Sequence, residues 1–486
     1  MSDVSELLTW FQASGGSLDS SVGFTEFPGC GRGAVALEDI PKGHVLFKIP
    51  REILLSTDTS TLPRRIGLDR WREAKMHIGW VGIILCMMWE TAQGPSSIWS
   101  KYLESLPATF DTPMFWSDLE LEQLAGTSVV GKLGKADAER DFKGKLLPMV
   151  QSRPDLFPLE TIPIYYTLGI YHVMGSRILS RSFDVEKDDP EEEPEEDGAP
   201  ADTSLGSAMD VDGPQDETES PHEGDSEPDD DSEGDEEEPF GVSMVPLADM
   251  LNARYGSENA KLFYETDDLR MVSTKSIKAG EQIWNTYGDL PNSELLRRYG
   301  HVDMLPLPTG DLGNPGDVVE ISADFAVAVL RPDETVTKAR IDWWLEQGGD
   351  DVVVLESDLE VPEALVSLIR LLRLTSDEWE KAVAKDKVPK PKIDNEILDV
   401  VRAIFERRLK EYPTTLADDV ALLANETLPL NKRHALIVRI GEKRILERAM
   451  QKIESQRVDA RKGDSSRKRK TQPEEEAGRM SKTRRH

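Results

Sequence analysis

An acidic tract from Asp184 to Pro239 is the feature that most constrains how this 486-residue chain can fold. It holds 27 Asp and Glu residues against a single Lys, and so carries −26 of the formal net charge of −33. A segment of like charges with almost no aromatic residues cannot bury enough apolar surface to offset its ordering entropy. We therefore expect a disordered insert over 184–239, which is either a solvated spacer or a dock for a basic partner.

Outside this tract the composition is that of a globular protein, with a net charge near −7. The only cysteines, Cys30 and Cys86, exclude a disulfide framework or a cysteine-rich zinc cluster and suit reduced thiols in the cytosol or nucleus. We expect no metal site. The N-terminal residues predict no signal peptide. The most apolar stretch, Gly79–Trp89, is too short to span a membrane and predicts a buried helix.

The spacing of the apolar residues predicts an α+β fold. Strands are expected between Gly23 and Ser56 and again between Val242 and Asn285. From Leu68 to about Phe183, and from Gly313 onward, apolar residues recur at three- and four-residue spacing, which is typical of helices. The last helices are expected at Glu334–Glu346, Pro362–Leu374, Asn395–Tyr412 and Leu430–Ser455.

The first strands are expected to form a hairpin, in which Ala34–Leu37 and Val45–Ile49 flank a turn at Pro41–Gly43. Three glycines in Pro28–Gly33 precede this hairpin. A phosphate-binding loop leads into a helix, whereas this one leads into a strand, so we reject that function for it.

The C-terminal residues Gln456–His486 form a basic tail with 11 Lys and Arg against 5 Asp and Glu. Its clusters Arg467–Lys470 and Lys482–Arg485 favour a nuclear-import signal. The alternative is a solvated tail that contacts the acidic insert or RNA without specificity. We expect no specific nucleic-acid partner.

Two segments carry residues suited to chemistry, in a chain with no HExxH motif, Walker loop or dinucleotide-binding fingerprint. Ser243–Ala253 is a strand that runs into a polar turn. Trp284–Asp289 is a strand end with a tyrosine beside a glycine, and a capped helix over Asn292–Gly300 follows it. Taken alone, Tyr287 is best interpreted as a structural tyrosine, and only its pairing with the first segment makes it a candidate for catalysis.

These motifs resemble those of SET-domain methyltransferases of the Rubisco large-subunit methyltransferase type. Within that family the chain is most similar to the branch of fungal ribosomal lysine methyltransferase 4 and SET-domain protein 6. The resemblance covers nearly the whole chain outside the acidic insert and the tail. It rests on motifs in this order: Gly31–Gly33 with Ala34–Ile40, Trp99–Pro107, Ser180–Phe183, Met244–Asn252, Asn285–Gly288 and Glu294–Gly300.

The resemblance implies a knotted, mostly β SET core in residues 1–305, with a helical segment inserted at about 56–180. A helical substrate-binding domain would follow at 306–455, and a disordered basic tail at 456–486. In this family the turn at Asn252 and the strand Asn285–Tyr287 cross, which would bring two distant segments around the cofactor.

The resemblance also implies S-adenosylmethionine as the cofactor. Gly31 and Arg32 would lie along it through backbone groups, and Arg181 would contact its carboxylate. Asp249 would support the turn, and Asn252 would hold the amino-acid end of the cofactor. Many relatives have a histidine after this asparagine; Ala253 can serve there if the contact with adenine is made by the main chain.

For the lysine, the resemblance implies that Tyr287 is catalytic and that Tyr299 and His301 help to line a channel. Methyl transfer to an amine requires alignment and a neutral nucleophile. Deprotonating a lysine of pKa about 10.4 at pH 7 costs about 4.6 kcal/mol, and a dry aromatic channel lowers this cost. Relatives usually carry Phe or Tyr where this chain has His301, which leaves the number of methyl groups open.

The predicted function is methylation of lysine in a basic protein, with a ribosomal protein favoured and a histone or nuclear factor second. Methylation of histidine and a catalytically silent SET-fold binding module are the alternatives. A module that has lost catalysis need not bind the cofactor, so calorimetry with the cofactor would distinguish it from an enzyme, and mass spectrometry of a modified substrate would distinguish lysine from histidine. We expect a monomer located in the nucleus, with the cytoplasm as the alternative, and no membrane partner.

Overall fold

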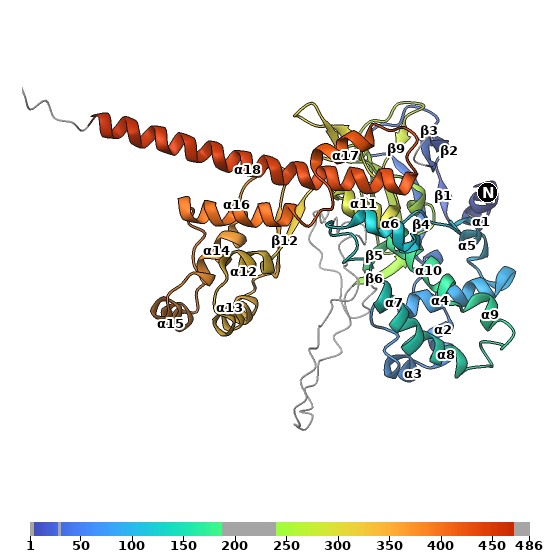
Figure 1. The fold of residues 1–486 in the computed structure, drawn as a ribbon. Coiled ribbons are helices and arrows are strands. Elements are labelled where there is room, and N and C mark those ends of the chain that lie inside the picture. The colour runs from blue at the N-terminus through green and yellow to red at the C-terminus, as the bar shows by residue number, and fades with distance from the viewer. Residues whose placement is uncertain (1–3, 28–30, 187–239, 471–486) are drawn as a thin grey trace, which may run out of the picture. The chain divides into compact units, whose positions relative to one another are not determined.

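The structure is a computed structural model that describes residues 4–27, 31–186 and 240–470. Its chain divides into two units (Figure 1). Unit 1 comprises Met1–Leu121 and Val129–Pro315, and unit 2 comprises Glu122–Ser128 and Gly316–His486. The fold is α+β, with most strands in unit 1 and a mainly helical unit 2, as predicted from the sequence.

Unit 1 is built on antiparallel sheets whose strands place alternate residues in the core. In β8, for example, Leu269 and Met271 are buried while the residues between them are partly exposed. The largest sheet has the order β1 (Ser17–Leu18), β4 (Val45–Pro50), β8 (Asp268–Ser273) and β7 (Ala260–Tyr264). The second sheet contains β2 (Val22–Phe27), β3 (Gly31–Ala36) and β9 (Gln282–Ile283). A short pair, β10 (Leu305–Pro306) and β11 (Leu312–Gly313), lies near the end of the unit.

The hairpin predicted around Pro41–Gly43 is wrong. β3 pairs with β2 and β9, whereas β4 pairs with β8 and β1, so the two predicted strands belong to different sheets. The connection between them is too long for a tight hairpin turn, and it bonds to a distant segment instead. Ile40 forms a bridge with Ile277, and the Pro41 carbonyl accepts the hydroxyl of Ser273.

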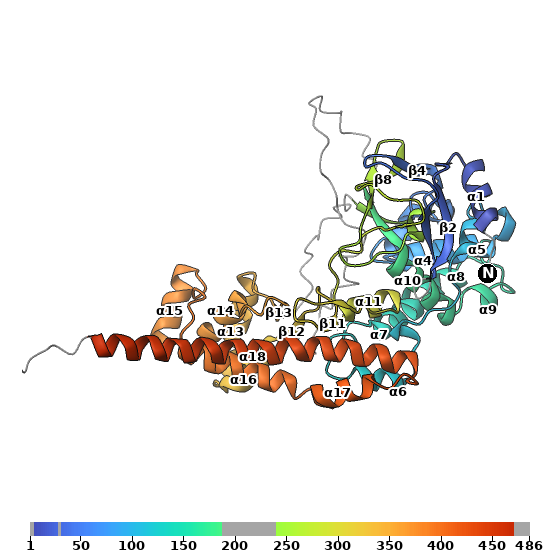
Figure 2. The same cartoon turned by 90° about the horizontal axis from the view of Figure 1, so that it is seen from above.

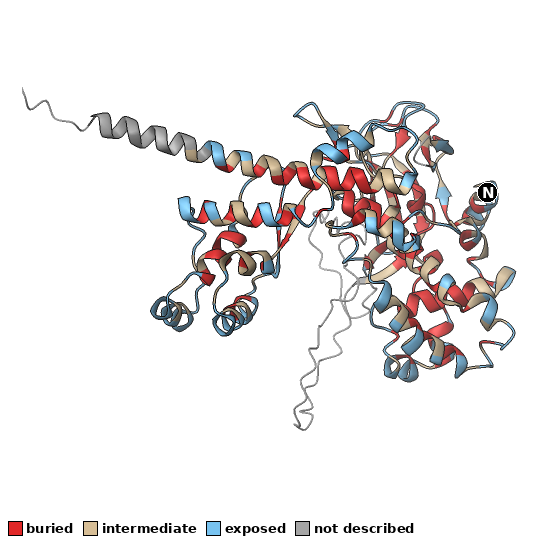
Figure 3. Ribbon diagram, in the orientation of Figure 1, coloured by how far each residue is buried: buried red, intermediate tan, exposed pale blue. Residues whose placement is uncertain are grey.

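The residues between β4 and β5 are helical, as predicted. The apolar stretch Gly79–Trp89 forms most of α4, which is buried on nearly all sides, and this confirms the predicted buried helix (Figure 3). The helices of unit 1 are α1 (Val4–Ala13), α2 (Leu62–Ile66), α3 (Leu68–Glu73), α4 (Val81–Ala92), α5 (Ser100–Ser105), α6 (Asp118–Leu121), α7 (Lys135–Asp141), α8 (Leu147–Gln151), α9 (Ile162–Tyr165), α10 (Leu168–Arg181) and α11 (Asn292–Tyr299).

The acidic tract begins inside a strand, which corrects the predicted start of the insert at residue 184. β5 (Ser182–Glu186) pairs with β6 (Phe240–Met244) over their full length. Ser182 faces Met244 and Glu186 faces Phe240, so the pairing brings together the two ends of the acidic segment. Residues 187–239 of the predicted insert lie outside the described residues.

Unit 2 consists of helices around a two-stranded sheet of β12 (Val319–Ser322) and β13 (Val352–Leu355). Side-chain caps begin several of the helices, including a capping box formed by Thr375 and Glu378. α16 lies beside α18 (Figures 1 and 2). The helices are α12 (Ala323–Leu330), α13 (Glu334–Glu346), α14 (Glu363–Leu372), α15 (Ser376–Lys385), α16 (Asn395–Leu409), α17 (Leu416–Leu423) and α18 (Leu430–Lys470).

The predicted start of a disordered tail at residue 456 is also corrected, because α18 continues to Lys470. Apart from Gly463, the residues from 456 to 470 are compatible with a helix, so nothing in their backbone preferences ends it earlier. The basic cluster Arg467–Lys470 therefore belongs to the helix, and Lys482–Arg485 lies outside the described residues.

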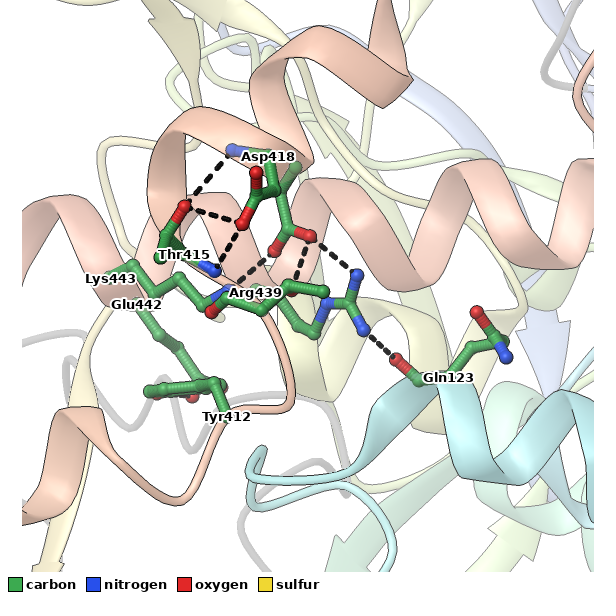
Figure 4. Close-up of polar contacts among 9 residues, drawn as sticks. Gln123, Tyr412, Thr415, Asp418, Arg439, Glu442 and Lys443 are labelled. Atoms are coloured by element: carbon green, nitrogen blue, oxygen red, sulfur yellow. Dashed lines mark hydrogen bonds and ion pairs between the residues drawn. The ribbon is translucent and has the colours of Figure 1, made fainter.

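A buried charge cluster joins α17 and α18 (Figure 4). The carboxylate of Asp419 is fully buried and accepts hydrogen bonds from Thr414, Arg439 and Lys443 at 2.6–2.7 Å. Arg439 also donates to the main-chain carbonyl of Gln123 at 3.1 Å. The cluster thus satisfies a buried anion with two cations and a hydroxyl.

Candidate active site

The structure brings together the two segments that the sequence predicted to cross. Ala253 and Asn285 form an isolated parallel bridge, and the main-chain N–H of Asn285 donates to the main-chain carbonyl of Asn252 at 3.0 Å. This contact joins residues more than thirty positions apart in the sequence. The polar turn and the strand end with Tyr287 therefore belong to one site.

The turn before Asn252 is held in an unusual backbone conformation. Leu247 has φ 70° and ψ −43°, in a region that residues with a side chain rarely adopt. Strain of this kind persists where the surroundings fix it, and here the short 3-10 helix Ala248–Met250 that follows is buried throughout. The conformation places Asp249 and Asn252 on the same tight turn.

Asp249 lies in a buried network with Tyr102 and Arg181. The Tyr102 hydroxyl donates to the Asp249 carboxylate at 3.0 Å, and the Arg181 guanidinium donates to the Asp249 main-chain carbonyl at 2.6 Å. Burial raises the pKa of Asp249 to about 6, although the positive charge of Arg181 opposes the shift. Burial and the charge of Asp249 raise the pKa of Tyr102 well above its usual value. Sequence reasoning placed Tyr102 only within a motif and missed its contact with the site.

Asn252 points toward the strand that contains Gly31 and Arg32. Its amide donates to the Arg32 carbonyl at 3.2 Å, and Gly31 adopts a left-handed conformation with φ 68°. A Cβ atom at Gly33 would lie 2.6 Å from the Asn252 amide nitrogen and 2.7 Å from that of Gln282. Gly33 is therefore required for the close approach of these side chains to β3. Gln282 was not among the predicted site residues, because an apolar strand gives no signal for one inward amide.

The three predicted channel residues lie next to one another. The rings of Tyr287 and Tyr299 stack at 4.1 Å with an angle of 3°, and the His301 ring lies 5.9 Å from that of Tyr299. Burial and the neighbouring Tyr287 raise the pKa of Tyr299 well above its usual value. Burial lowers the pKa of His301, while Asp303 opposes this shift. The stack joins the strand end to α11.

A small open pocket lies beside this stack. Its lining combines aromatic, apolar and charged residues in or next to the turn, the strand end and α11: Ala253, Arg254, Tyr255, Tyr287, Gly288, Leu290, Leu295 and Asp303. Tyr287 is thus both stacked on Tyr299 and exposed to the pocket. An extended alkyl side chain with a polar end is the kind of group that such a lining accepts.

The turn also fits a polar ligand that carries both signs of charge. Within the described residues, three buried polar atoms around it have no hydrogen-bond partner, namely Arg181 Nε, Asp249 Oδ1 and Gln282 Nε2. Buried polar atoms seldom lack partners, so such a cluster indicates a place where a ligand completes the bonding. The amino-acid end of S-adenosylmethionine, with its carboxylate and ammonium, has the groups that these atoms require.

Comparison with protein families gives the site its context. The model of the SET domain matches residues 31–288, which is more than half of the chain. The chain belongs to the SET-domain family. The Rubisco LSMT substrate-binding model matches residues 331–446, within unit 2. The predicted family and its helical C-terminal domain are therefore confirmed.

Curated relatives agree along most of the chain. N-lysine methyltransferase setd6 of Xenopus laevis is 27% identical over 93% of this chain and 95% of its own. Human SETD6 is 28% identical over 87% of this chain and 84% of its own. Ribosomal lysine N-methyltransferase 4 of Saccharomyces cerevisiae is 31% identical, over 56% of this chain and 49% of its own.

Among solved structures, Rubisco LSMT bound to AdoMet is similar with a TM-score of 0.62 and 19% identity, covering 94% of this chain and 93% of that one. This likeness supports the fold. Family and relatives together make the chain a protein-lysine N-methyltransferase that uses S-adenosylmethionine. In the part of the chain that the structure describes, no helix is both long and apolar enough to cross a membrane.

Proposed function

We propose that this methyltransferase modifies a basic protein, and that the substrate is a ribosomal protein. The support is the yeast relative, which is named for ribosomal lysine and has 31% identity over its matched region. A histone or another nuclear factor is the second candidate, because the negative charge of the acidic tract suits any basic partner. The main support for the proposed site is the main-chain hydrogen bond between Asn252 and Asn285, which joins the polar turn to the strand end with Tyr287.

On the cofactor side, we propose that Asn252 and Arg181 hold the amino-acid end and that Asp249 maintains the turn. The main chain at Gly31, Arg32 and Ala253 would complete the binding surface. The bond from the Asn252 amide to the Arg32 carbonyl supports this grouping, since it links the turn to β3. When bound, S-adenosylmethionine supplies a methyl group on a positively charged sulfur.

On the lysine side, we propose that the Tyr287 hydroxyl orients the reacting groups and that the rings of Tyr287 and Tyr299 exclude water. Water exclusion favours the neutral amine that the reaction needs. The parallel stack at 4.1 Å supports this role, because it fixes the Tyr287 ring, which also lines the pocket. The His301 ring lies 5.9 Å from that of Tyr299, and its size would influence how many methyl groups the channel accepts.

The proposed location is the nucleus, supported by the basic clusters Arg467–Lys470 and Lys482–Arg485, with the cytoplasm as the alternative. We propose that the enzyme acts as a monomer. Expression of the full chain with each cluster replaced by alanines, followed by imaging, tests the location. Retention of the wild-type distribution by both variants would contradict it.

The test of the proposed function is transfer of labelled methyl groups to ribosomal and nuclear extracts, followed by mass spectrometry of the labelled proteins. A modified lysine in a ribosomal protein is the expected product. A modified histidine, or label confined to histones or other nuclear factors, would contradict the proposal.

The test of the site is Tyr287→Phe, which removes one hydroxyl and keeps the stack. We expect at least a tenfold loss of kcat, about 1.4 kcal/mol of transition-state stabilisation, with cofactor binding preserved. Tyr264→Phe, in β7 of the large sheet, is the matched control and should keep normal activity. Normal activity of Tyr287→Phe would remove its hydroxyl from the mechanism.

A further inference from the structure

Gln282 is a buried polar side chain that the proposed mechanism does not use. Gln282 is 8% exposed, and its side-chain amide nitrogen has no hydrogen-bond partner within the described residues. The main chain of Gln282, in contrast, has a partner: its carbonyl accepts a hydrogen bond from the Asn259 side chain at 3.0 Å. A donor left unpaired in the interior costs stability, so its presence calls for a ligand that pairs with it.

The sheet directs this amide toward the Asn252 turn. Gln282 pairs with Val35 in the register of β3 and β9, and Gly33 lies two residues before Val35, on the same face of the strand. Because Gly33 has no side chain, the space above it is open to the amides of both Gln282 and Asn252. Both amide nitrogens lie within 2.7 Å of the same point, the position that a Cβ atom would occupy.

We propose that the Gln282 amide donates a hydrogen bond to the amino-acid end of the bound cofactor, beside Asn252. Two convergent amide donors suit a carboxylate, which accepts several hydrogen bonds at once. Gln282 would thereby add one donor to a group that Asn252 and Arg181 already hold. This inference rests on the proposed role of Asn252 in cofactor binding.

The experiment measures binding of two ligands to the full-length protein by calorimetry. S-adenosylhomocysteine contains the amino-acid end, and 5′-methylthioadenosine lacks it. Gln282→Met keeps the length of the side chain but removes the donor, and we expect it to bind S-adenosylhomocysteine about tenfold more weakly. Affinity for 5′-methylthioadenosine should stay unchanged. An equal loss for both ligands, or no loss for either, would overturn the proposal.

Two further variants guard against a trivial result. Gln151→Met carries the same exchange at an exposed position of α8 and should leave both affinities unchanged. Gln282→Asn withdraws the amide by one methylene group. It should fall between wild type and Gln282→Met for S-adenosylhomocysteine, which tests the proposal again if the methionine variant does not fold.

Asn252→Ala separates the inference from the proposed function on which it rests. If Asn252→Ala leaves binding of S-adenosylhomocysteine intact, the proposed cofactor site itself fails. If Asn252→Ala weakens binding while Gln282→Met does not, only the role of Gln282 fails. Gly33→Ala should weaken binding of S-adenosylhomocysteine as well, because its methyl group would displace both amides.

Discussion

Two buried aspartates, one in each unit, differ in how fully their carboxylates are paired. In unit 2, the Asp419 carboxylate accepts hydrogen bonds from Thr414, Arg439 and Lys443. In unit 1, the Asp249 carboxylate accepts one from Tyr102, and its other oxygen has no partner within the described residues. Burial is similar, with Asp419 0% and Asp249 8% exposed.

The difference separates a structural network from a binding site. A buried anion with two cations and a hydroxyl is already satisfied, and removing it leaves the cations unpaired. A buried anion with one partner is costly in the free protein and is retained where another function requires it. Asp249 lies on the strained turn beside Asn252, whereas Asp419 lies on a regular helix.

The largest expected effect is on stability in unit 2. Asp419→Ala leaves Arg439 and Lys443 buried without their anion, and should lower the free energy of unfolding by about 3–5 kcal/mol. Urea unfolding of the full chain, followed by circular dichroism, measures this. The control is Asp418→Ala, next in the chain but exposed, which loses its hydrogen bonds with Thr415 at the helix cap and should cost much less. Equal losses would contradict the structural role of the cluster.

A smaller effect is expected when Asp249 loses Tyr102, its only side-chain donor among the described residues. Tyr102→Phe should lower the free energy of unfolding by about 1.5–3 kcal/mol at pH 7.5, because a buried carboxylate is left unpaired. The loss should shrink toward pH 5, where protonation removes the charge. Tyr166→Phe is the matched control: Tyr166 is 2% exposed, and its hydroxyl donates to no other described residue. A loss independent of pH would show that the bond to Asp249 is not its cause.

The next prediction concerns the charge of Asp249 itself. Its pKa in the folded protein, about 6, lies above the usual 3.8, so folding favours the protonated form. The stability that the protonated Asp249 carboxyl group contributes is fully present below about pH 4 and is lost as pH rises toward 6. Asn at this position does not titrate and so avoids this loss. Between pH 5 and pH 7 the free energy of unfolding of Asp249→Asn should rise by about 1 kcal/mol relative to that of the wild type. Thermal melts across this range measure the gain.

The same substitution should weaken cofactor binding, so that stability and function move in opposite directions. The charge of Asp249 acts near Arg181, and a neutral amide would hold the turn less firmly. Calorimetry with S-adenosylhomocysteine at pH 7.5 checks this. A variant that gains stability and binds as tightly as the wild type would remove Asp249 from the proposed site.

Sequence alone was sufficient for the periodic elements and the family. The helices at 334–346 and 395–409 follow from apolar spacing and capping residues, both of which are local. The site residues were reached through resemblance, because Asn252 and Asn285 are far apart in sequence. No local pattern reports that their main chains are bonded.

What sequence reasoning missed depends on long-range packing. The predicted hairpin failed because the strands around Pro41–Gly43 find better partners in β8 and β9, which lie more than two hundred residues away. Tyr102 and Gln282 were missed as site residues for a related reason. Each is an ordinary residue in its own helix or strand, and only the folded chain directs its polar group to the site.

At pH 5, the smallest effect is expected at Glu442, a second buried acid in unit 2. Burial, with further contributions from Asp317 and Glu320, raises its pKa to about 8, and its carboxyl group is bonded to Tyr412. Glu442→Gln imitates the protonated form, so the unfolding free energy at pH 5 should stay within about 1 kcal/mol of the wild type. Since the wild type loses stability as pH rises from about 4.5 to 8, the free energy of unfolding of Glu442→Gln should increase relative to that of the wild type over that range. Exposed Glu411→Gln controls for the loss of one negative charge. A Glu442→Gln variant that is much less stable at pH 5 would show that this carboxyl is held ionised, as Asp419 is by its two cations.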